Sequence, residues 1–229
     1  MNVDWLPGNA LTLLENGAEF FPALEAAIDG AGHEIFLETY IFADDETGHR
    51  VAAALRRAAA RGVAVRLLVD GFGGREFVAA LMDQLVAAGV NVLIYRREMA
   101  AFSLQRHRLR RLHRKLAVID GRIAFVGGIN IISDYNHDDP SLITPRQDFS
   151  VRVEGPLLGP IHRTASRVWE LVAWASFRRR ARLTGSPPAC PLPCGTVEAG
   201  FLIRDNIRHR HDIEDAYLAA IAGARSEIL

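Results

Sequence analysis

Short apolar runs of β type alternate with amphipathic helical segments along the first 95 residues, and Gly or Asp turns separate them. This alternation is typical of a layered α/β domain, because a strand and the helix that follows it each need a partner for an apolar face. Thr47 is the expected cap of the second helix. Strands are expected at 11–14, 34–42, 63–70 and 91–95, and helices at 20–31, 47–60 and 76–88.

Composition narrows the class of protein. The chain has 229 residues, of which 49% are apolar, and its 27 basic and 27 acidic side chains leave no net charge. This balance argues against a general polyanion binder, nucleic acid is not an expected partner, and an anionic ligand needs a local basic patch. Two cysteines fit a reduced compartment. No uncharged apolar run reaches the roughly 18 residues that span a bilayer, so we expect a soluble or peripherally bound chain.

Residues 96–114 interrupt the alternation with a basic loop. The stretch carries seven arginines and one acid, with Met99, Phe102 and Leu104 interleaved. Such a composition suits an anionic interface, and it is also found in solvated surface loops. The loop leads into two short β-type runs, 116–119 and 123–126, which an Asp-Gly turn should join as a hairpin.

The rest of the chain predicts one boundary. A strand at 149–153 and a helix at 157–176 precede a basic and proline-rich stretch, whose prolines cannot join a sheet. We therefore expect a first domain over 1–177, a linker over 178–197 and the start of a second domain over 198–229.

The C-terminal segment is similar to an earlier part of the same chain. Residues 217–229 align with 24–36 without a gap, and seven of the thirteen positions are identical. Both segments change from helical to strand period at a Glu-Ile pair, which indicates a duplicated unit. On this interpretation the chain ends at the opening strand of a second copy, and that end should be frayed or completed by a further segment.

One constellation combines residues that phosphate chemistry needs. His113 and Lys115 stand two apart at the start of an expected strand, so both side chains project to one face and can meet one phosphate. Asn130 follows Gly127 and Gly128, where small residues allow close approach, and can add a neutral donor. Lys115 is the one lysine among 27 basic residues, and an ammonium fits a tight phosphate pocket better than a planar guanidinium does.

His113 has the chemistry of a nucleophile or a base. An unperturbed pKa of about 6.5 allows a neutral imidazole near neutral pH, and such a ring needs a partner that orients its far nitrogen. Asp148, just before the strand expected at 149–153, is the candidate, since an acid there would fix the tautomer and stabilise the imidazolium. Other histidines are expected at the surface, namely His33, His49, His107, His162, His209 and His211.

Spacing disfavours other kinds of site. The sequence has no Gly-rich phosphate loop and no nucleophile elbow, and residues 71–74 lack the spacing of a dinucleotide loop. The histidines and acids at 107, 113, 134 and 137–139 match no zinc pattern, so we expect no metal and no cofactor. Cys190 and Cys194 are expected to be linker thiols.

The string His-x-Lys-x4-Asp-x6-Gly-Gly-x-Asn, from His113 to Asn130, resembles the motif of the phospholipase D superfamily. Nearly the whole chain is also similar to the bacterial cardiolipin synthases, especially the B type. The similar segments are 8–9, 13–17, 37–42, 68–73, 112–115, 123–130, 147–148, 151–156 and 204–206. The resemblance implies a phospholipase D-like α-β-α sandwich with a mixed sheet, as one complete repeat plus the start of a second.

The resemblance also implies a reaction. One motif's histidine attacks a phosphodiester, a second motif's histidine protonates the leaving alcohol, and another alcohol accepts the phosphatidyl group. The catalytic set that this carries over is His113, as nucleophile or its acid–base partner, with Lys115, Asp120 and Asp148. Lys115 and Asn130 would bind phosphate oxygens, Asp148 would orient His113, and Asp120 is expected to anchor the hairpin turn.

The implied partners are anionic glycerophospholipids, phosphatidylglycerol and cardiolipin, at a membrane surface. The resemblance places the chain on the cytoplasmic side of a bacterial cell membrane as a peripheral protein. Interfacial basic residues attract such a surface. The headgroup contacts expected in the basic loop are Arg106, Arg108, Arg110 and Arg111.

One departure from the family pattern leaves three interpretations open. The family has two such motifs in a chain and this sequence has one, so half of the acid–base pair is missing from it. The chain can be the N-terminal half of a phosphatidyltransferase whose partner half completes the site. It can also be a dimeric single-motif phosphodiesterase or nuclease, which pairs two copies of one histidine across a two-fold axis, or a silent lipid-binding fragment. We expect the first.

Overall fold

The computed structural model describes residues 3–95, 111–137, 139, 141–176, 192–204 and 209–228. Within these ranges the strands are β1 (Trp5–Glu15), β2 (Glu34–Thr39), β3 (Ala64–Asp70), β4 (Asn91–Tyr95), β5 (Leu116–Ile119), β6 (Ile123–Gly127), β7 (Phe149–Glu154) and β8 (Val197–Gly200). They form one mixed sheet in the order β4-β3-β2-β5-β6-β7-β1-β8. The β2, β3 and β4 strands are parallel to one another, and the other neighbours are antiparallel.

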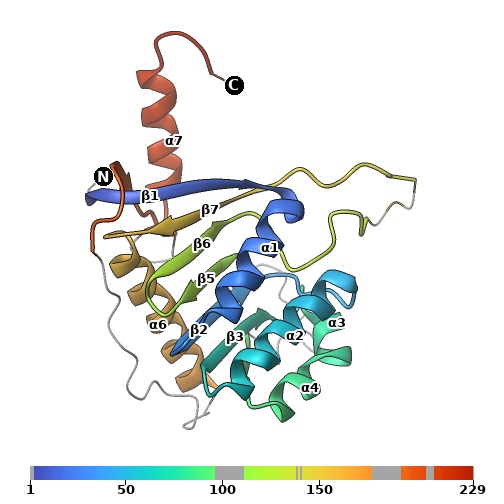
Figure 1. Ribbon diagram of the computed structural model, residues 1–229. Coiled ribbons are helices and arrows are strands. Elements are labelled where there is room, and N and C mark those ends of the chain that lie inside the picture. The colour runs from blue at the N-terminus through green and yellow to red at the C-terminus, as the bar shows by residue number, and fades with distance from the viewer. Residues whose placement is uncertain are drawn as a thin grey trace.

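Helices cover both faces of this sheet (Figure 1). The helices α1 (Asn16–Asp29), α2 (Glu46–Ala60), α3 (Arg75–Ala80) and α4 (Met82–Ala87) lie on one face, and α6 (Leu158–Ala175) lies on the other. Alternate side chains of β2 pack into the cores on opposite faces of the sheet. Ile35 and Leu37 pack with the first group of helices, and Phe36 packs with α6. The expected α-β-α sandwich with a mixed sheet is confirmed.

The first strand is longer than the sequence predicts. It begins at Trp5 rather than near residue 11, because Pro7 and Gly8 form an irregularity between Leu6 and Asn9 instead of a turn that ends the strand. The buried Asn9 amide holds this irregularity together, donating to the carbonyl oxygens of Leu6 at 2.6 Å and of Val197 in β8 at 3.2 Å.

Two predictions about helices are wrong. The cap of α2 is Asp45 rather than Thr47, because the Asp45 carboxylate accepts a hydrogen bond from the Gly48 N–H at 2.9 Å. The single helix expected over 76–88 is the pair α3 and α4, which meet at Leu81, where φ is −114°. The break lets both short helices turn apolar side chains toward the same core.

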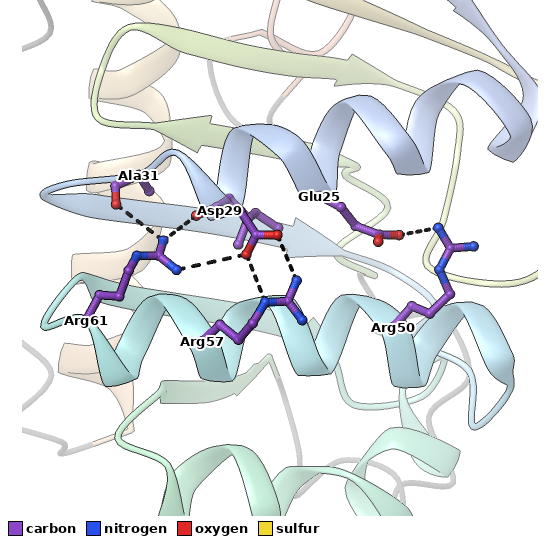
Figure 2. A network of polar contacts seen from close by, with 7 residues as sticks. Glu25, Asp29, Ala31, Arg50, Arg57 and Arg61 are labelled. Atoms are coloured by element: carbon purple, nitrogen blue, oxygen red, sulfur yellow. Dashed lines mark hydrogen bonds and ion pairs between the residues drawn. The ribbon is translucent and has the colours of Figure 1, made fainter.

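Polar contacts join the outer surfaces of α1 and α2 (Figure 2). Arg57 donates to both carboxylate oxygens of Asp29, at 3.0 and 2.8 Å, and Arg50 donates to Glu25 at 2.7 Å. The hydrogen bond from Arg57 lowers the pKa of the Asp29 carboxyl. Exposed ion pairs of this kind contribute about 0–1 kcal/mol each, so the buried apolar faces supply most of the stability of this layer.

The layer between the sheet and α6 contains a buried polar network, and His162 belongs to it. The sequence predicts a surface histidine there, but His162 is buried and its Nε2 lies 2.6 Å from Glu34 Oε1. Arg66 donates to Glu34 Oε2 at 2.8 Å. The network ties β2, β3 and α6 together, and each buried charge in it has a partner.

The end of the described chain consists of β8 and α7 (Asp212–Gly223). The β8 strand pairs antiparallel with β1, and α7 projects away from the sheet with no buried residue (Figure 1). This strand-then-helix order repeats that of β1 and α1. Residues 224–228 form no strand, and β8 begins inside the range expected for the linker, most of which (178–191) lies outside the described residues.

Candidate active site

The mixed topology brings five segments of the chain to one end of the sheet (Figure 1). The parallel strands β2 and β3 end there, and Tyr40 and Asp70 lie at or just beyond their last residues. The antiparallel β5 begins there, directly after His113 and Lys115. The β6 strand ends there at Gly127. The β7 strand begins there at Phe149, directly after Asp148.

His113 and Lys115 meet at this end, as their spacing predicts. The His113 Nε2 atom lies 3.1 Å from the Lys115 Nζ atom, with the ring exposed and the lysine half-buried. The Tyr40 ring lies close to both groups, with its centroid 5.0 Å from the imidazole centroid and 5.4 Å from Nζ. Sequence reasoning missed Tyr40, because an aromatic residue after a buried strand is more often part of the core.

Burial sets the protonation of the pair. Although His113 is exposed, partial desolvation lowers the pKa of its imidazole, the Lys115 charge lowers it further, and the Asp70 carboxylate acts in the opposite direction. Burial also lowers the pKa of Lys115, to about 8, while the charge of Asp148 acts to raise it. Near neutral pH the site therefore presents a neutral ring nitrogen beside an ammonium, which is what a nucleophile next to an oxyanion binder requires.

Asn130 is held with its amide donor available. Its Oδ1 atom accepts from the Ile41 N–H at 3.0 Å, which orients the side chain and leaves the Nδ2 group as the end that can donate. The glycines before it are required by contact, because a Cβ atom on Gly128 would lie 2.0 Å from Asp148 Oδ1 and one on Gly127 would lie 2.4 Å from the Ser150 Cα atom.

Asp148 reaches the site but does not make the contact that the sequence predicts. Its Oδ1 atom accepts from the N–H of Phe149 at 2.8 Å, and its own N–H donates to Asn16 Oδ1 at 2.9 Å. Among the described residues, no hydrogen bond joins Asp148 to the His113 ring, and its charge acts on Lys115 instead.

Asp120 lies at the opposite end of β5 from His113, so the structure separates it from the rest of the expected catalytic set. Its carboxylate accepts from the backbone N–H groups of Gly32, His33 and Glu34, each at 2.8 Å. Burial raises the pKa of Asp120, but these three backbone donors outweigh it and the pKa is lowered. With φ at 53°, Asp120 forms the hairpin turn and fastens it to the segment that begins β2.

Asp70 is a buried residue of the site that sequence reasoning missed. Its Oδ1 atom accepts from the N–H groups of Phe72 at 2.9 Å and Gly73 at 3.3 Å, and its Oδ2 atom accepts from the Leu112 N–H at 2.8 Å. Leu112 directly precedes His113 in the chain. An Asp-Gly pair after a strand predicts a local turn, and the sequence carries no signal of the second bond to a residue so distant in the chain.

The basic loop is described only at its C-terminal end. Arg106, Arg108 and Arg110 lie outside the described residues, whereas Arg111 is exposed and places its guanidinium carbon 4.0 Å from the centroid of the Phe72 ring. In the described ranges, no group of three histidine, cysteine, aspartate or glutamate side chains is arranged to hold a metal ion. None of the described helices has the length and apolar character needed to cross a bilayer.

A solved structure shares the fold. NucT from Helicobacter pylori superposes with a TM-score of 0.50 at 17% identity, over 69% of this chain and 92% of that one. This likeness concerns the fold alone.

Comparison of the sequence with known proteins identifies the family. Cardiolipin synthase B of Salmonella typhi is 39% identical over 230 residues, covering 100% of this chain and 54% of that protein. Cardiolipin synthase B of Escherichia coli K12 is 37% identical over 231 residues, with the same coverage of 100% and 54%. The chain thus spans about half the length of these curated relatives. Residues 24–141, more than half of the chain, match the family model described as cardiolipin synthase, PLD-like domain, and the chain therefore belongs to that family.

Proposed function

We propose that this chain carries one half-site of a phosphatidyltransferase of the cardiolipin synthase type, which moves a phosphatidyl group between glycerophospholipids. The observation that carries the proposal is the approach of His113 Nε2 to Lys115 Nζ, at 3.1 Å, at an accessible end of the sheet. Family membership supports the substrate class, an anionic glycerophospholipid such as phosphatidylglycerol or cardiolipin.

The proposed reaction has two steps. In the first, Nε2 of the neutral His113 ring attacks phosphorus, so that a P–N bond forms and the P–O bond to the leaving alcohol breaks. A histidine of a second half-site gives its proton to the leaving oxygen. In the second step, the acceptor alcohol gives its proton to that histidine and attacks phosphorus, and the P–N bond breaks. Both rings then return to their starting state.

Two groups of this chain hold the phosphate during both steps. In this proposal the Lys115 ammonium and the Asn130 amide, whose Oδ1 is already taken by the Ile41 N–H, donate to the non-bridging oxygens, where negative charge is concentrated. The neutral His113 ring is retained near neutral pH because burial and the adjacent ammonium both lower its pKa. Asp148 supports the site through its charge, which favours the protonated form of Lys115.

The membrane is the second element of the proposal. We assign the basic loop, with Arg106, Arg108, Arg110 and Arg111, to the anionic headgroups on the cytoplasmic side of a bacterial membrane. Each basic residue near such a surface contributes about 1 kcal/mol, and the contribution is screened by salt. Binding to anionic vesicles should therefore weaken as salt is raised, and binding that does not respond to salt would contradict this assignment.

Complementation tests the proposed activity. The chain is mixed with the separately expressed C-terminal half of the Salmonella typhi relative and supplied with radiolabelled phosphatidylglycerol. We expect labelled cardiolipin from the mixture, little from either half alone, and none when His113 is replaced by Ala. The N-terminal half of the relative serves as the positive control.

Two outcomes would contradict the proposal. One is a mixture that stays inactive while the control pair makes cardiolipin. The other is a dimer of this chain alone that hydrolyses a generic phosphodiester, which would show the single-motif phosphodiesterase instead.

A further inference from the structure

Two arginines gather on one exposed aromatic ring beside the candidate active site. The guanidinium carbon of Arg111 lies 4.0 Å from the centroid of the Phe72 ring, and that of Arg75 lies 4.3 Å from it. Phe72 is 42% exposed, so the ring is accessible at the surface instead of forming part of the core. We call Phe72, Arg75 and Arg111 the arginine clamp. Arg111 stands two residues before His113, which limits the distance between their Cα atoms to about 7 Å.

A buried carboxylate holds the two backbone segments of the arginine clamp together. Asp70 is 2% exposed, and it accepts from the N–H of Phe72 through one oxygen and from the N–H of Leu112, next to Arg111, through the other. The loop after β3 and the segment that enters β5 are therefore fixed to each other. The backbone segments that carry the Phe72 ring and Arg111 are thus held next to each other.

No acid in the described part of the chain forms an ion pair with the arginine clamp. Among the described residues, neither Arg75 nor Arg111 forms an ion pair, and Asp70 directs both carboxylate oxygens to backbone N–H groups. A guanidinium that rests on a ring uses its face for that contact, while its N–H donors lie in the plane and stay available. Such donors match the oxygens of a phosphate, which they can bind in pairs.

We propose that the arginine clamp binds the phosphate of the acceptor phospholipid. The inference rests on the proposed function for the identity of the lipid. Transfer of a phosphatidyl group to a phosphatidylglycerol hydroxyl joins two phosphates through one glycerol, so the site must hold two phosphates close together. His113 and Lys115 hold the one that reacts, and the arginine clamp holds the other. The arginine clamp therefore favours an acceptor alcohol that carries a phosphate over water or free glycerol.

Vesicle flotation tests the arginine clamp without turnover. The probes are phosphatidylcholine vesicles with and without phosphatidylglycerol, and glycerol 3-phosphate is the soluble competitor, with glycerol as its control. We expect the double variant Arg75→Gln/Arg111→Gln to bind the phosphatidylglycerol vesicles about 10-fold more weakly than the matched double variant Arg56→Gln/Arg122→Gln. Both variants remove two charges, and the control arginines are exposed, on α2 and at the far end of β5.

A third variant distinguishes the contribution of the Phe72 ring to vesicle binding from that of the two arginine charges. Phe72→Leu keeps both arginines and should still weaken binding, because the guanidinium groups lose the surface that orients them. Glycerol 3-phosphate should weaken binding of the phosphatidylglycerol vesicles by the unmodified chain to the level of the Arg75→Gln/Arg111→Gln variant, and glycerol should not. Equal weakening by the two double variants, unchanged binding by Phe72→Leu, or a failure of glycerol 3-phosphate to compete would each overturn the arginine clamp.

This test and the test of the proposed function fail separately. Vesicle binding is measured with this chain alone, whereas phosphatidyl transfer is measured with the complemented mixture, so each readout is obtained without the other. Specific binding together with a lack of phosphatidyl transfer would sustain the arginine clamp and overturn the proposed function. Transfer together with equal binding of the two double variants would do the reverse.

Discussion

At the scale of the residue, the reactive character of the site comes from charges that act on one imidazole. The His113 ring faces the Lys115 ammonium, the Tyr40 ring and the charge of Asp70. Lys115 and burial favour the neutral ring, and Asp70 favours the protonated one. The acid whose charge favours the imidazolium is therefore Asp70, whereas the sequence predicts that Asp148 orients the ring.

Opposite substitutions around His113 should move its pKa in opposite directions. We expect Asp70→Asn to lower the His113 pKa, because the carboxylate that favours the imidazolium is removed. Lys115→Met should raise it, because the ring no longer faces a cation. A titration of the ring resonances by NMR measures both, with the surface residue His49 as the internal control. A shift in the same direction for both variants would refute this electrostatic picture.

Binding of a phosphodiester should weaken as pH rises through about 8, the pKa of Lys115. The ammonium that attracts the anion loses its proton above that value. Dimethyl phosphate is a suitable probe, because it keeps a single charge throughout the range. Asp148→Asn should shift this loss to lower pH, since the Asp148 charge raises the pKa of Lys115. Binding followed by NMR that stays constant from neutral to alkaline pH would contradict the assignment of Lys115.

At the scale of the element, Asp120 fixes the β5–β6 turn to the segment before β2. Asp120→Ala removes an acceptor for three backbone N–H groups, and we expect the free energy of unfolding to fall by about 2 kcal/mol. Asp120→Asn keeps a residue that tolerates the positive φ and should cost less. Urea denaturation measures both. Dimethyl phosphate binding by the folded Asp120→Asn variant should be unchanged. Loss of that binding would show that Asp120 contributes to the active site.

A second acid gives the sheet a pH-dependent stability. Burial raises the pKa of Glu38 to about 7 from 4.5, against the opposing charge of Arg114, whose Nη1 atom lies 3.5 Å from Glu38 Oε2. A raised acid pKa means that the folded state holds the proton more tightly, so this contribution to stability is present below 4.5 and is lost as pH rises through 7.

The stability difference between the unmodified chain and Glu38→Gln isolates this effect. We expect the difference in the free energy of unfolding to fall by up to about 3 kcal/mol as pH rises from 4.5 to 7. Urea titrations of both proteins across that range provide the measurement. Since other titrating groups cancel in the comparison, a difference that does not change with pH would show that Glu38 stays ionised in the folded state.

The elements show what local patterns can predict and what they cannot. The spacing of His113 and Lys115 predicts that their side chains share one face, and the structure, in which both residues directly precede β5, brings them within 3.1 Å. Tyr40 and Asp70 reach the same place from β2 and β3, through a mixed pairing of strands that no local pattern specifies. The contact of His162 with Glu34 could not be predicted either, because an isolated histidine on a helix gives no sign of a buried carboxylate on a distant strand.

At the scale of the whole molecule, the chain brings His113 and Lys115 together at the accessible end of an α-β-α sandwich. It spans about half the length of its cardiolipin synthase B relatives. The β8 and α7 elements repeat the order of β1 and α1, and α7 exposes Tyr217, Leu218 and Ile221 to solvent. We propose that these elements open a second unit, as the internal similarity of 217–229 to 24–36 predicts. A second unit could bring the histidine that the proposed reaction requires.

A covalent bond between His113 and phosphorus is the central claim, and trapping tests it most directly. The chain and its complementing half are mixed with radiolabelled phosphatidylglycerol, quenched at alkaline pH where a P–N bond survives, and digested for mass spectrometry. The account predicts label on the peptide that contains His113, and no label after His113→Ala. Cardiolipin formed without label on His113, and formed equally well by His113→Ala, would contradict it.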